Sequence, residues 1–282
     1  MSERFDTRSP DVYDPTLYRF DVVADSVRRF ADVGDAQVEL FRLNGYLVIR
    51  EAFGPPEVEA ALAGLQHLIE GKNPAFHGVQ FESWARERLD EMSAQEKQDA
   101  IRKLSRFSAH DERLKAIAHD PALLDVVRRL VGGEPAIFQD QALIKPPGRG
   151  TEKPWHQDKA FFNIDVDAPV VGVWMALDPA TAENGCMHVI PGSHRDGPVP
   201  HFRRRDFQIC DADVETARDV IVPLEPGGLL FFDGLIHHGT PANRSPNRRR
   251  ALQFHYTTAD ARWLDEAYRL GVFGSEGSGA AC

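Results

Sequence analysis

The sequence predicts a mainly β fold, a sandwich or small barrel, with helices from the N-terminal half packed on it. Residues 135–258 form short β-branched or aromatic segments separated by proline, glycine, asparagine and aspartate, which is typical of strands joined by turns. Residues 36–133 instead repeat apolar side chains mainly at helical spacing. No linker divides the two parts, so we expect a single domain over residues 1–282.

The N-terminal half is expected to be helical, with one strand. One amphipathic segment ends at Asn44-Gly45, and a second begins at Pro55 and ends before Gly71, which are the usual start and stop signals of helices. We expect helices at 36–45, 55–70, 93–104 and 121–133, and a strand at 46–53. Residues 1–20 predict an extended arm, and the small residues of 274–282 predict a flexible tail.

The C-terminal half is expected to supply most of the strands. We expect them at 136–146, 153–158, 170–178, 186–193, 220–225, 228–234 and 248–257. The basic segment HFRRRDF at 201–207 is interpreted as a solvated loop.

Charge and composition disfavour several classes of protein. The formal net charge of -10, from 33 basic and 43 acidic residues, argues against a nucleic-acid binder or a protein of anionic membranes. Neither a membrane-spanning apolar run nor a secretory signal is visible. The cysteines, Cys186, Cys210 and Cys282, form no CxxC pair, so we expect no disulfide scaffold and no cysteine zinc site. We expect a cytoplasmic protein with a small-molecule substrate, which can be anionic if its pocket is locally basic.

The segment WHQD at 155–158 indicates a metal site. Residues i and i+2 of a strand point to the same face, so His156 and Asp158 are expected to converge. A third ligand is available after the apolar strand 229–232, where His237 and His238 follow a turn. Two histidines and one carboxylate bind one face of an octahedral metal, the arrangement of non-haem Fe(II) oxygenases.

Such an oxygenase commonly takes electrons from 2-oxoglutarate, whose remote carboxylate is best held by an arginine. Three arginines begin the strand at 248–257, and alternation distinguishes among them. Arg249 shares its face with Ala251, Gln253 and His255, a polar face suited to a ligand-filled interior, whereas Leu252, Phe254 and Tyr256 suit packing against helices. Arg249 is therefore the expected anchor.

These residues resemble the phytanoyl-CoA dioxygenase family of Fe(II)/2-oxoglutarate-dependent oxygenases. The matching segments, in order, are NGYLVI near residue 44, IKPPG at 144, HQD at 156, ENGCMHVIPGSH at 183 and HGTPANRSPNRR at 238. The resemblance implies a double-stranded β-helix (a cupin-like jelly roll) with helical support. It selects His238, which precedes Gly-Thr, over His237, and it places the cosubstrate arginine eleven residues later, again at Arg249.

Further positions follow from the resemblance alone. The layout is most similar to the phytanoyl-CoA dioxygenase domain-containing protein 1 type, which implies cosubstrate contacts at Gln141, Trp174 and Lys103. Gln141 stands where a methionine is expected. Trp174 shares strand parity with Gly172 and Ala176, which leaves room for a ligand.

The expected activity is hydroxylation of an unactivated C–H bond of a small organic molecule, with Fe(II), 2-oxoglutarate and O2, and with release of succinate and CO2. An intact Asp158 argues against a halogenase. A non-oxygenase cupin-like isomerase or sensor is the main alternative, and a zinc hydrolase is a weaker one. Trp155, Phe161 and Phe162 are candidates for the mouth of the site, and His255 is a candidate substrate contact. The sequence predicts neither the substrate nor the oligomeric state.

Overall fold

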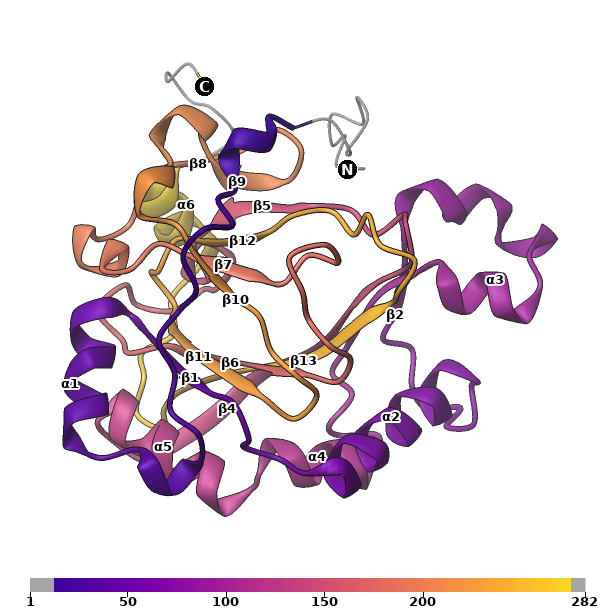
Figure 1. Cartoon of the computed structure of the whole chain (residues 1–282), viewed down its shortest axis with the longest axis horizontal. Helices are drawn as coiled ribbons and strands as arrows, with labels where there is room; N and C mark the ends of the chain where they lie inside the picture. Colours follow the sequence, from indigo (N-terminus) through magenta and orange to yellow (C-terminus); the bar gives the residue numbers. More distant parts are fainter. Residues whose placement is uncertain (1–12, 275–281) are drawn as a thin grey trace.

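The computed structural model describes residues 13–274 and Cys282. Two antiparallel sheets face each other and form a double-stranded β-helix (Figure 1). The larger sheet contains, in spatial order, β1 (Tyr46–Ile49), β11 (Leu229–Asp233), β6 (Val171–Ala176), β13 (Arg249–Thr258), β4 (Pro135–Lys145), β3 (Ile101–Ser105) and β2 (Val79–Phe81). The smaller sheet contains β10 (Val220–Val222), β7 (Met187–Val189), β12 (His238–Thr240) and β5 (Lys153–His156). A separate hairpin pairs β8 (His201–Arg203) with β9 (Phe207–Ile209).

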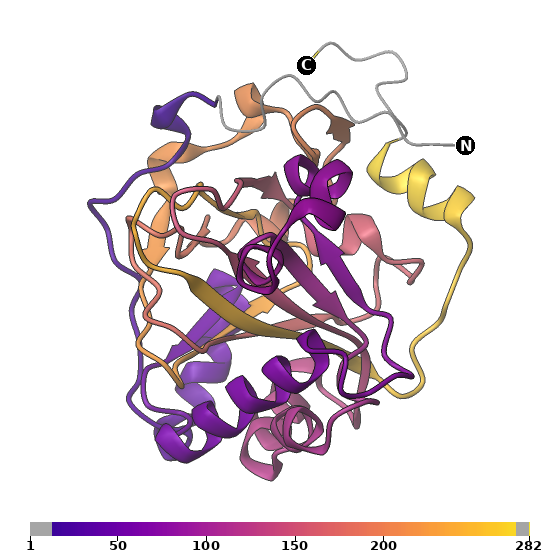
Figure 2. The ribbon, with the colours of Figure 1, turned by 90° about the vertical axis from the view of Figure 1, so that its right-hand side faces the viewer.

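Helices cover the outer face of the larger sheet. They are α1 (Asp35–Asn44), α2 (Pro55–Ile69), α4 (Glu112–Ala118) and α5 (Pro121–Val131). Figure 2 shows two of them, α2 and α4, running side by side beneath the sheet. Two further helices, α3 (Ala94–Asp99) and α6 (Glu266–Phe273), lie outside this layer. The 3-10 helices are η1 (Pro15–Leu17), η2 (Phe30–Asp32), η3 (Ser83–Glu91), η4 (Asp158–Phe161), η5 (Ser193–Asp196), η6 (Asp211–Asp213) and η7 (Thr216–Arg218).

Strand alternation divides the apolar side chains into two main clusters. Leu252, Phe254 and Tyr256 of β13 join the cluster beneath the helices, the side that alternation predicts for them. Trp174 and Ala251 belong to a second cluster, between the two sheets. The polar members of the inward face of β13 are therefore enclosed between the sheets, where a buried polar group needs a partner.

The helices predicted at 36–45, 55–70 and 121–133 are confirmed. Of the strand predicted at 46–53, only Tyr46–Ile49 forms β1, and residues 50–53 form a turn before α2. Gly45 and Gly132 both adopt the left-handed conformation just after their helices end, with φ of 79° and 74°.

The helix predicted at 93–104 is wrong in its second half. A capping box between Ser93 and Glu96 begins α3, but the helix ends at Asp99 and the following residues form β3. Pairing with β4 and β2 places Ile101 and Leu104 in the core, and this long-range pairing overrides the local helical pattern. Neither α4, β2 nor α6 was predicted as a separate element.

The basic segment 201–207 is also not a solvated loop. It forms most of the hairpin β8–β9, in which His201 and Phe202 are buried. Arg205 at its turn is bound by Glu152 and Asp211, so its charge is neutralised inside the structure.

Both ends of the described chain pack onto this fold. Leu17 and Tyr18 are buried, and Tyr18 donates a hydrogen bond to Glu152, so residues 13–18 of the predicted arm pack against the fold. Residues 1–12 of the predicted arm, and residues 275–281 of the predicted tail, lie outside the described residues.

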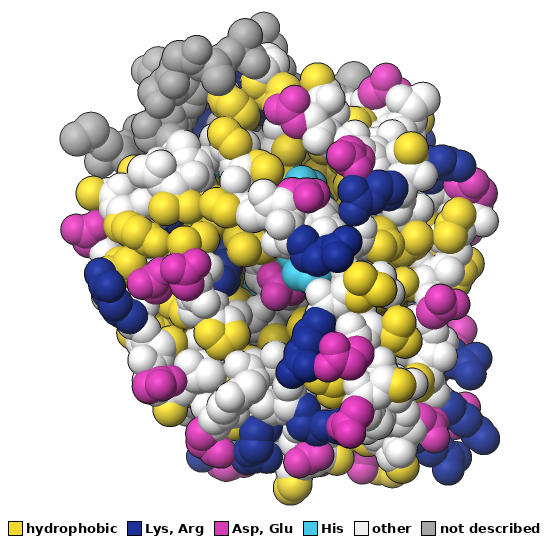
Figure 3. All heavy atoms as spheres, turned by 90° about the vertical axis from the view of Figure 1, so that its left-hand side faces the viewer, with side chains coloured by type: hydrophobic (Ala, Val, Ile, Leu, Met, Phe, Trp, Pro, Cys, Tyr) yellow, Lys and Arg dark blue, Asp and Glu magenta, His cyan; other side chains and the backbone are white. Residues whose placement is uncertain are grey.

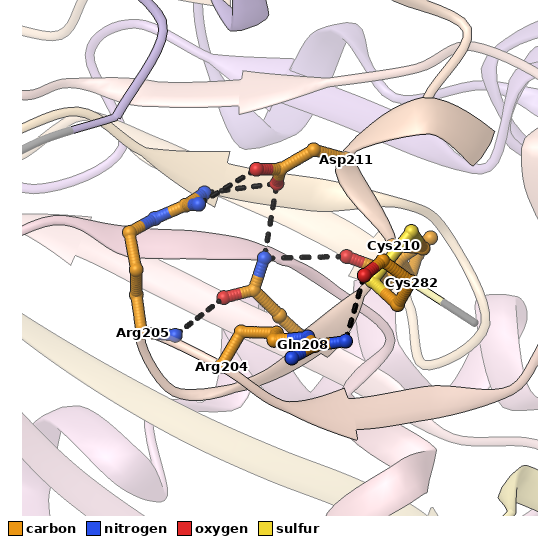
Figure 4. Close-up of a disulfide and its surroundings, with 7 residues drawn as sticks. Arg204, Arg205, Gln208, Cys210, Asp211 and Cys282 are labelled. Carbon is orange, nitrogen blue, oxygen red and sulfur yellow. Dashed lines mark hydrogen bonds and ion pairs between the residues drawn. A yellow bond between two sulfur atoms is a disulfide. The ribbon is translucent and has the colours of Figure 1, made fainter. Parts of the chain in front are cut away.

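Cys210 forms a disulfide with Cys282 across 72 residues, while Cys186 is free and buried (Figure 4). Arg204 donates a hydrogen bond to the carbonyl of Cys282, beside the bond. One disulfide is not a scaffold, but this pair was not predicted from cysteine spacing.

The charge distribution on the outer surface is that of an ordinary globular protein. On the face shown in Figure 3, acidic and basic side chains are interspersed, so the negative net charge forms no large one-sign field there. Within the part of the chain that the structure describes, none of the helices has both the length and the apolar character needed to cross a membrane.

Candidate metal centre

The structure brings His156, Asp158 and His238 together between the sheets. His156 ends β5 and His238 begins β12, and the two residues are direct partners in the register of these strands. Ligand atoms of all three side chains lie within 4.8 Å of one another, and all three are buried. Three such donors on one side of a point leave the opposite side open, the geometry that two histidines and one carboxylate offer to Fe(II).

The step from His156 to Asp158 follows strand geometry although β5 ends at His156. Gln157 is extended, with φ of −110° and ψ of 129°, so its neighbours still project to the same side. The side chain of Gln157 turns away and donates hydrogen bonds to the carbonyls of Gly197 and Leu235. Asp158 then begins η4 instead of continuing the strand.

Backbone contacts orient both imidazoles toward the same point. The carbonyl of Pro154 lies 2.7 Å from Nδ1 of His156, and the carbonyl of Ile236 lies 3.1 Å from Nδ1 of His238. Because a carbonyl can only accept, each Nδ1 carries the proton and each Nε2 presents a lone pair. The two Nε2 atoms lie 3.2 and 3.6 Å from Oδ1 of Asp158.

The second oxygen of Asp158 is occupied by side chains of β13. Nε2 of His255 lies 2.7 Å from Oδ2, and Nε2 of Gln253 lies 3.1 Å from it. Both donate to Oδ2, so Oδ1 is the oxygen that remains for a metal. Sequence reasoning placed Gln253 and His255 on the inward face but missed this contact.

The protonation states suit metal binding. Burial, with a contribution from His238 and Lys153, lowers the pKa of His156 to about 4. Burial opposes ionisation of Asp158, but the neighbouring His238 and His255 hold its pKa well below the ordinary value. A neutral imidazole beside an ionised carboxylate is the form that coordinates a divalent metal.

Arg249 faces the same interior, the side that alternation predicts for it. It is only 2% exposed, and its guanidinium carbon lies 5.3 Å from the ring centre of Trp174. Arg248 and Arg250 point outward, where they pair with Asp99 and Asp178.

Among residues 13–274, no carboxylate is paired with the guanidinium of Arg249. Its Nε and Nη1 are buried without a hydrogen bond among the described residues, and so is Nε1 of Trp174. Burial lowers the pKa of Arg249 to about 10, so the group remains charged at neutral pH. A buried, unpaired cation is costly, and these unsatisfied donors fit a carboxylate such as that of 2-oxoglutarate.

The other residues implied by the resemblance lie on the same inward face. Gln141 pairs with Gln253 in the register of β4 and β13, and Gln253 pairs with Trp174 on β6. Lys103 lies on β3, opposite Leu143, and not on a helix. Gly172 does not leave room for a ligand beside Trp174, because a side chain there would lie 2.2 Å from the ring of Phe232.

The aromatic residues near the site have different roles. Phe161 is 38% exposed and lies edge-on to the ring of His156, with ring centres 5.6 Å apart, so it borders the site. Phe162 packs on the ring of His255 at 4.8 Å. Trp155 does not border the mouth, since strand alternation turns it to the other side of β5, where it stacks on Tyr18.

The remaining candidate histidines lie apart from the three ligands. His237 precedes His238 and its backbone N–H donates to Ser193. His188 is fully buried and its Nδ1 lies 2.9 Å from Asp219. No other group of three or more possible metal ligands was found among residues 13–274 and Cys282.

Comparison with known proteins gives consistent results. The family model described as "Phytanoyl-CoA dioxygenase (PhyH)" matches residues 41–251. The zebrafish phytanoyl-CoA dioxygenase domain-containing protein 1 is 28% identical over 258 residues, covering 78% of this chain and 89% of the relative. The rat peroxisomal phytanoyl-CoA dioxygenase is 24% identical over 241 residues, covering 81% of this chain and 69% of the relative.

Solved structures share the fold. EctD from S. alaskensis, in its apo form, superposes with a TM-score of 0.68 at 24% identity, covering 93% of this chain and 86% of EctD. The non-haem α-ketoglutarate-dependent carbocyclase SnoK superposes with a TM-score of 0.66 at 22% identity, covering 86% of this chain and 90% of SnoK.

Proposed function

The chain belongs to the phytanoyl-CoA dioxygenase (PhyH) family of iron- and 2-oxoglutarate-dependent enzymes, and from this we propose that it hydroxylates an unactivated C–H bond of a small organic molecule. It is a dioxygenase whose cofactor is iron and whose cosubstrates are 2-oxoglutarate and O2. The residue roles and the reaction outcome given below are our proposal.

The observation that carries the proposal is Arg249. Its buried and unpartnered guanidinium faces the interior that holds the three possible metal ligands. A dicarboxylate can be bound there at both ends, by the metal and by the arginine. An isomerase or sensor of the same fold has no use for such a group, so Arg249 favours the oxygenase over this alternative.

Each side chain has a part in this reaction. His156 and His238 would bind the metal through Nε2, and Asp158 through Oδ1. When bound, iron supplies the oxidising chemistry that consumes O2 and 2-oxoglutarate and releases succinate and CO2. Arg249 would hold the remote carboxylate, and Trp174 would offer its indole N–H beside it. Gln141 and Lys103 stay predictions as cosubstrate contacts.

Apolar side chains would keep the centre dry. Phe232 packs on the ring of His238 at 4.8 Å, and Phe161 covers His156. Exclusion of water strengthens the electrostatic interactions in the site and protects the substrate position from side reactions.

The test is succinate formation. The protein is supplied with Fe(II) and 2-oxoglutarate in air, with and without a panel of small organic molecules, and succinate and hydroxylated product are measured. We expect 2-oxoglutarate-dependent succinate formation that His156→Ala or Asp158→Ala abolishes. Turnover that survives strict exclusion of O2 would contradict the oxygenase and favour a hydrolase or isomerase.

A further inference from the structure

Lys145 is a second buried cation beside Arg249. It ends β4, it is only 5% exposed, and it is the direct partner of Arg249 in the register of β4 and β13. Residues paired in this way project to the same face of a sheet, so Lys145 also points into the space between the two sheets. Within the described chain, its ammonium meets backbone carbonyls and pairs with no carboxylate.

The ammonium reaches across to the smaller sheet, which lies opposite β13 (Figure 1). Nζ of Lys145 donates to the carbonyls of Thr151 at 2.7 Å, Thr240 at 3.2 Å and Pro241 at 2.5 Å. An ammonium has three N–H donors, so each of them meets one carbonyl. Thr151 shortly precedes β5 and Thr240 ends β12, the two strands that carry the histidine ligands. One side chain of the larger sheet thus holds both of these strands.

Lys145 also holds the segment that joins the metal centre to the cosubstrate anchor. His238 begins β12 and Arg249 begins β13, and the loop 241–248 connects the two strands. The ammonium of Lys145 binds the start of this loop, and the side-chain amide of Asn243, within the loop, donates to the main-chain carbonyl of Lys145 at 3.2 Å. The loop is therefore bound to β4 by the side chain and by the main chain of the same lysine.

The surroundings leave Lys145 little freedom to move. A Cβ at Gly150 would lie 2.6 Å from Cβ of Lys145, and a Cβ at Gly185 would lie 3.2 Å from its Cδ and 2.3 Å from the carbonyl oxygen of Pro241. The backbone thus closes on the lysine stem because these two positions are glycine.

Packing alone does not explain a cation at this position. Burial, together with the nearby Arg249, lowers the pKa of Lys145 well below its ordinary value, which shows that the charge is unfavourable there. An apolar side chain of similar length would fill the same space without that cost. The ammonium differs from such a side chain in the three carbonyls that it holds.

We propose that Lys145 is a positioning residue that sets the distance between Arg249 and the metal ligands and thereby selects the chain length of the dicarboxylate cosubstrate. This proposal rests on the proposed function. A 2-oxo diacid must reach the metal with its oxoacid end and Arg249 with its remote carboxylate, so a fixed distance admits one chain length. Arg249 can pair with the remote carboxylate of a longer diacid equally well, so the selection lies in the distance.

Anaerobic binding of two 2-oxo diacids to the Fe(II)-loaded protein tests this proposal. The probes are 2-oxoglutarate and 2-oxoadipate, which share the metal-chelating end and differ by one methylene. The Kd of each is measured from the visible absorption of its iron complex. We expect the unmodified protein to bind 2-oxoglutarate about tenfold more tightly, or better, than 2-oxoadipate. Unfolded protein reduces the amplitude of the absorption and leaves the ratio of the two Kd values unchanged, so a loss of stability does not imitate a loss of selection.

Variants locate the effect. Lys145→Met keeps an apolar stem without the ammonium and should lower the preference for 2-oxoglutarate by about tenfold. Asn243→Ala releases the loop from the main chain of Lys145 and should change the preference in the same direction. The matched control is Lys159→Met, because Lys159 is also buried and its ammonium also donates to backbone carbonyls, among them that of Val166 at 2.7 Å. Lys159 binds neither the loop nor β4, so its replacement should leave the preference unchanged even where it lowers stability.

The outcomes separate this proposal from the proposed function. Equal affinity of the unmodified protein for the two acids would overturn the proposal, and this measurement needs no variant. An unchanged preference in Lys145→Met, or in Asn243→Ala where Lys145→Met does not fold, would also overturn it and leave Lys145 with a structural role. Absence of an absorption change with either acid would contradict the proposed function, and this proposal with it.

Discussion

Replacing His255 with phenylalanine removes the shorter of the two hydrogen bonds to Oδ2 of Asp158 and keeps a ring in place. His255 donates at 2.7 Å, and its ring packs on Phe162 and Phe138, contacts that phenylalanine preserves. Its Nδ1 is buried without a partner among the described residues, so the substitution also removes an unsatisfied polar atom. We therefore expect lower metal affinity together with some loss of folding stability, because the metal-free protein already makes this bond to a buried carboxylate.

The expected magnitude follows from the charge of the acceptor. A hydrogen bond to an ionised group contributes about 1.5–3 kcal/mol, which is the upper limit of the expected loss of folding stability in the metal-free protein. Substitution of residues that hold metal ligands costs about 10–100-fold in metal affinity, which is the loss expected here. Gln253→Leu, which removes the longer bond at 3.1 Å from a neutral amide, should have the smaller effect.

Titration calorimetry of the metal-free protein with Mn(II) measures this directly, because it needs no turnover. The matched control is His119→Phe, at an exposed position that follows α4. Urea denaturation of the same metal-free proteins reports their folding stability. Mn(II) affinity of His255→Phe within about twofold of the unmodified protein would show that His255 does not hold Asp158 for a metal.

The other predictions concern the cosubstrate, the hairpin and the disulfide. Arg249→Met should raise the 2-oxoglutarate concentration for half-maximal succinate formation by about a hundredfold or more, since a buried charge pair is lost, and an unchanged requirement would remove Arg249 from the site. Burial lowers the pKa of His201 to about 3, whereas a histidine in the unfolded chain has a pKa of about 6.5. The buried neutral imidazole therefore contributes fully to folding stability above about pH 6.5, and this contribution is lost as the pH falls toward 3. Urea denaturation of His201→Phe should therefore show a weaker loss of stability between neutral pH and about pH 4, and an equally steep loss would contradict this assignment. Cys282→Ser should lower the free energy of unfolding by up to about 4 kcal/mol, because the bond to Cys210 closes a loop across 72 residues, and a reductant should have the same effect on the unmodified protein only. Equal stability with and without reductant would mean that the bond does not form in solution.

Local patterns predicted the parts of the fold that local chemistry determines. The left-handed glycines that follow α1 and α5 terminate both helices near the predicted positions. The alternation of β13 placed Arg249 between the sheets and Leu252 beneath the helices before any tertiary contact was known. In both cases the side-chain period or the backbone requirement is intrinsic to the residues themselves.

The remaining features depend on contacts between distant segments. Ile101–Ser105 follows a helix directly and forms a strand only because β4 and β2 pair with it. The arginines of 201–207 suggested a solvated loop, but Glu152, distant in sequence, neutralises Arg205. The bond from His255 to Asp158 depends on how the two sheets face each other, which the alternation of one strand does not specify.

The most direct test of the metal centre is an anaerobic titration of the Fe(II)-loaded protein with 2-oxoglutarate, followed by visible absorption. We predict a charge-transfer band that saturates at one 2-oxoglutarate per chain, is lost in Asp158→Ala, and appears only at higher 2-oxoglutarate concentration in Arg249→Met. Absence of the band in the unmodified protein, or its undiminished presence in Asp158→Ala, would contradict the assignment of these side chains to an iron and 2-oxoglutarate site.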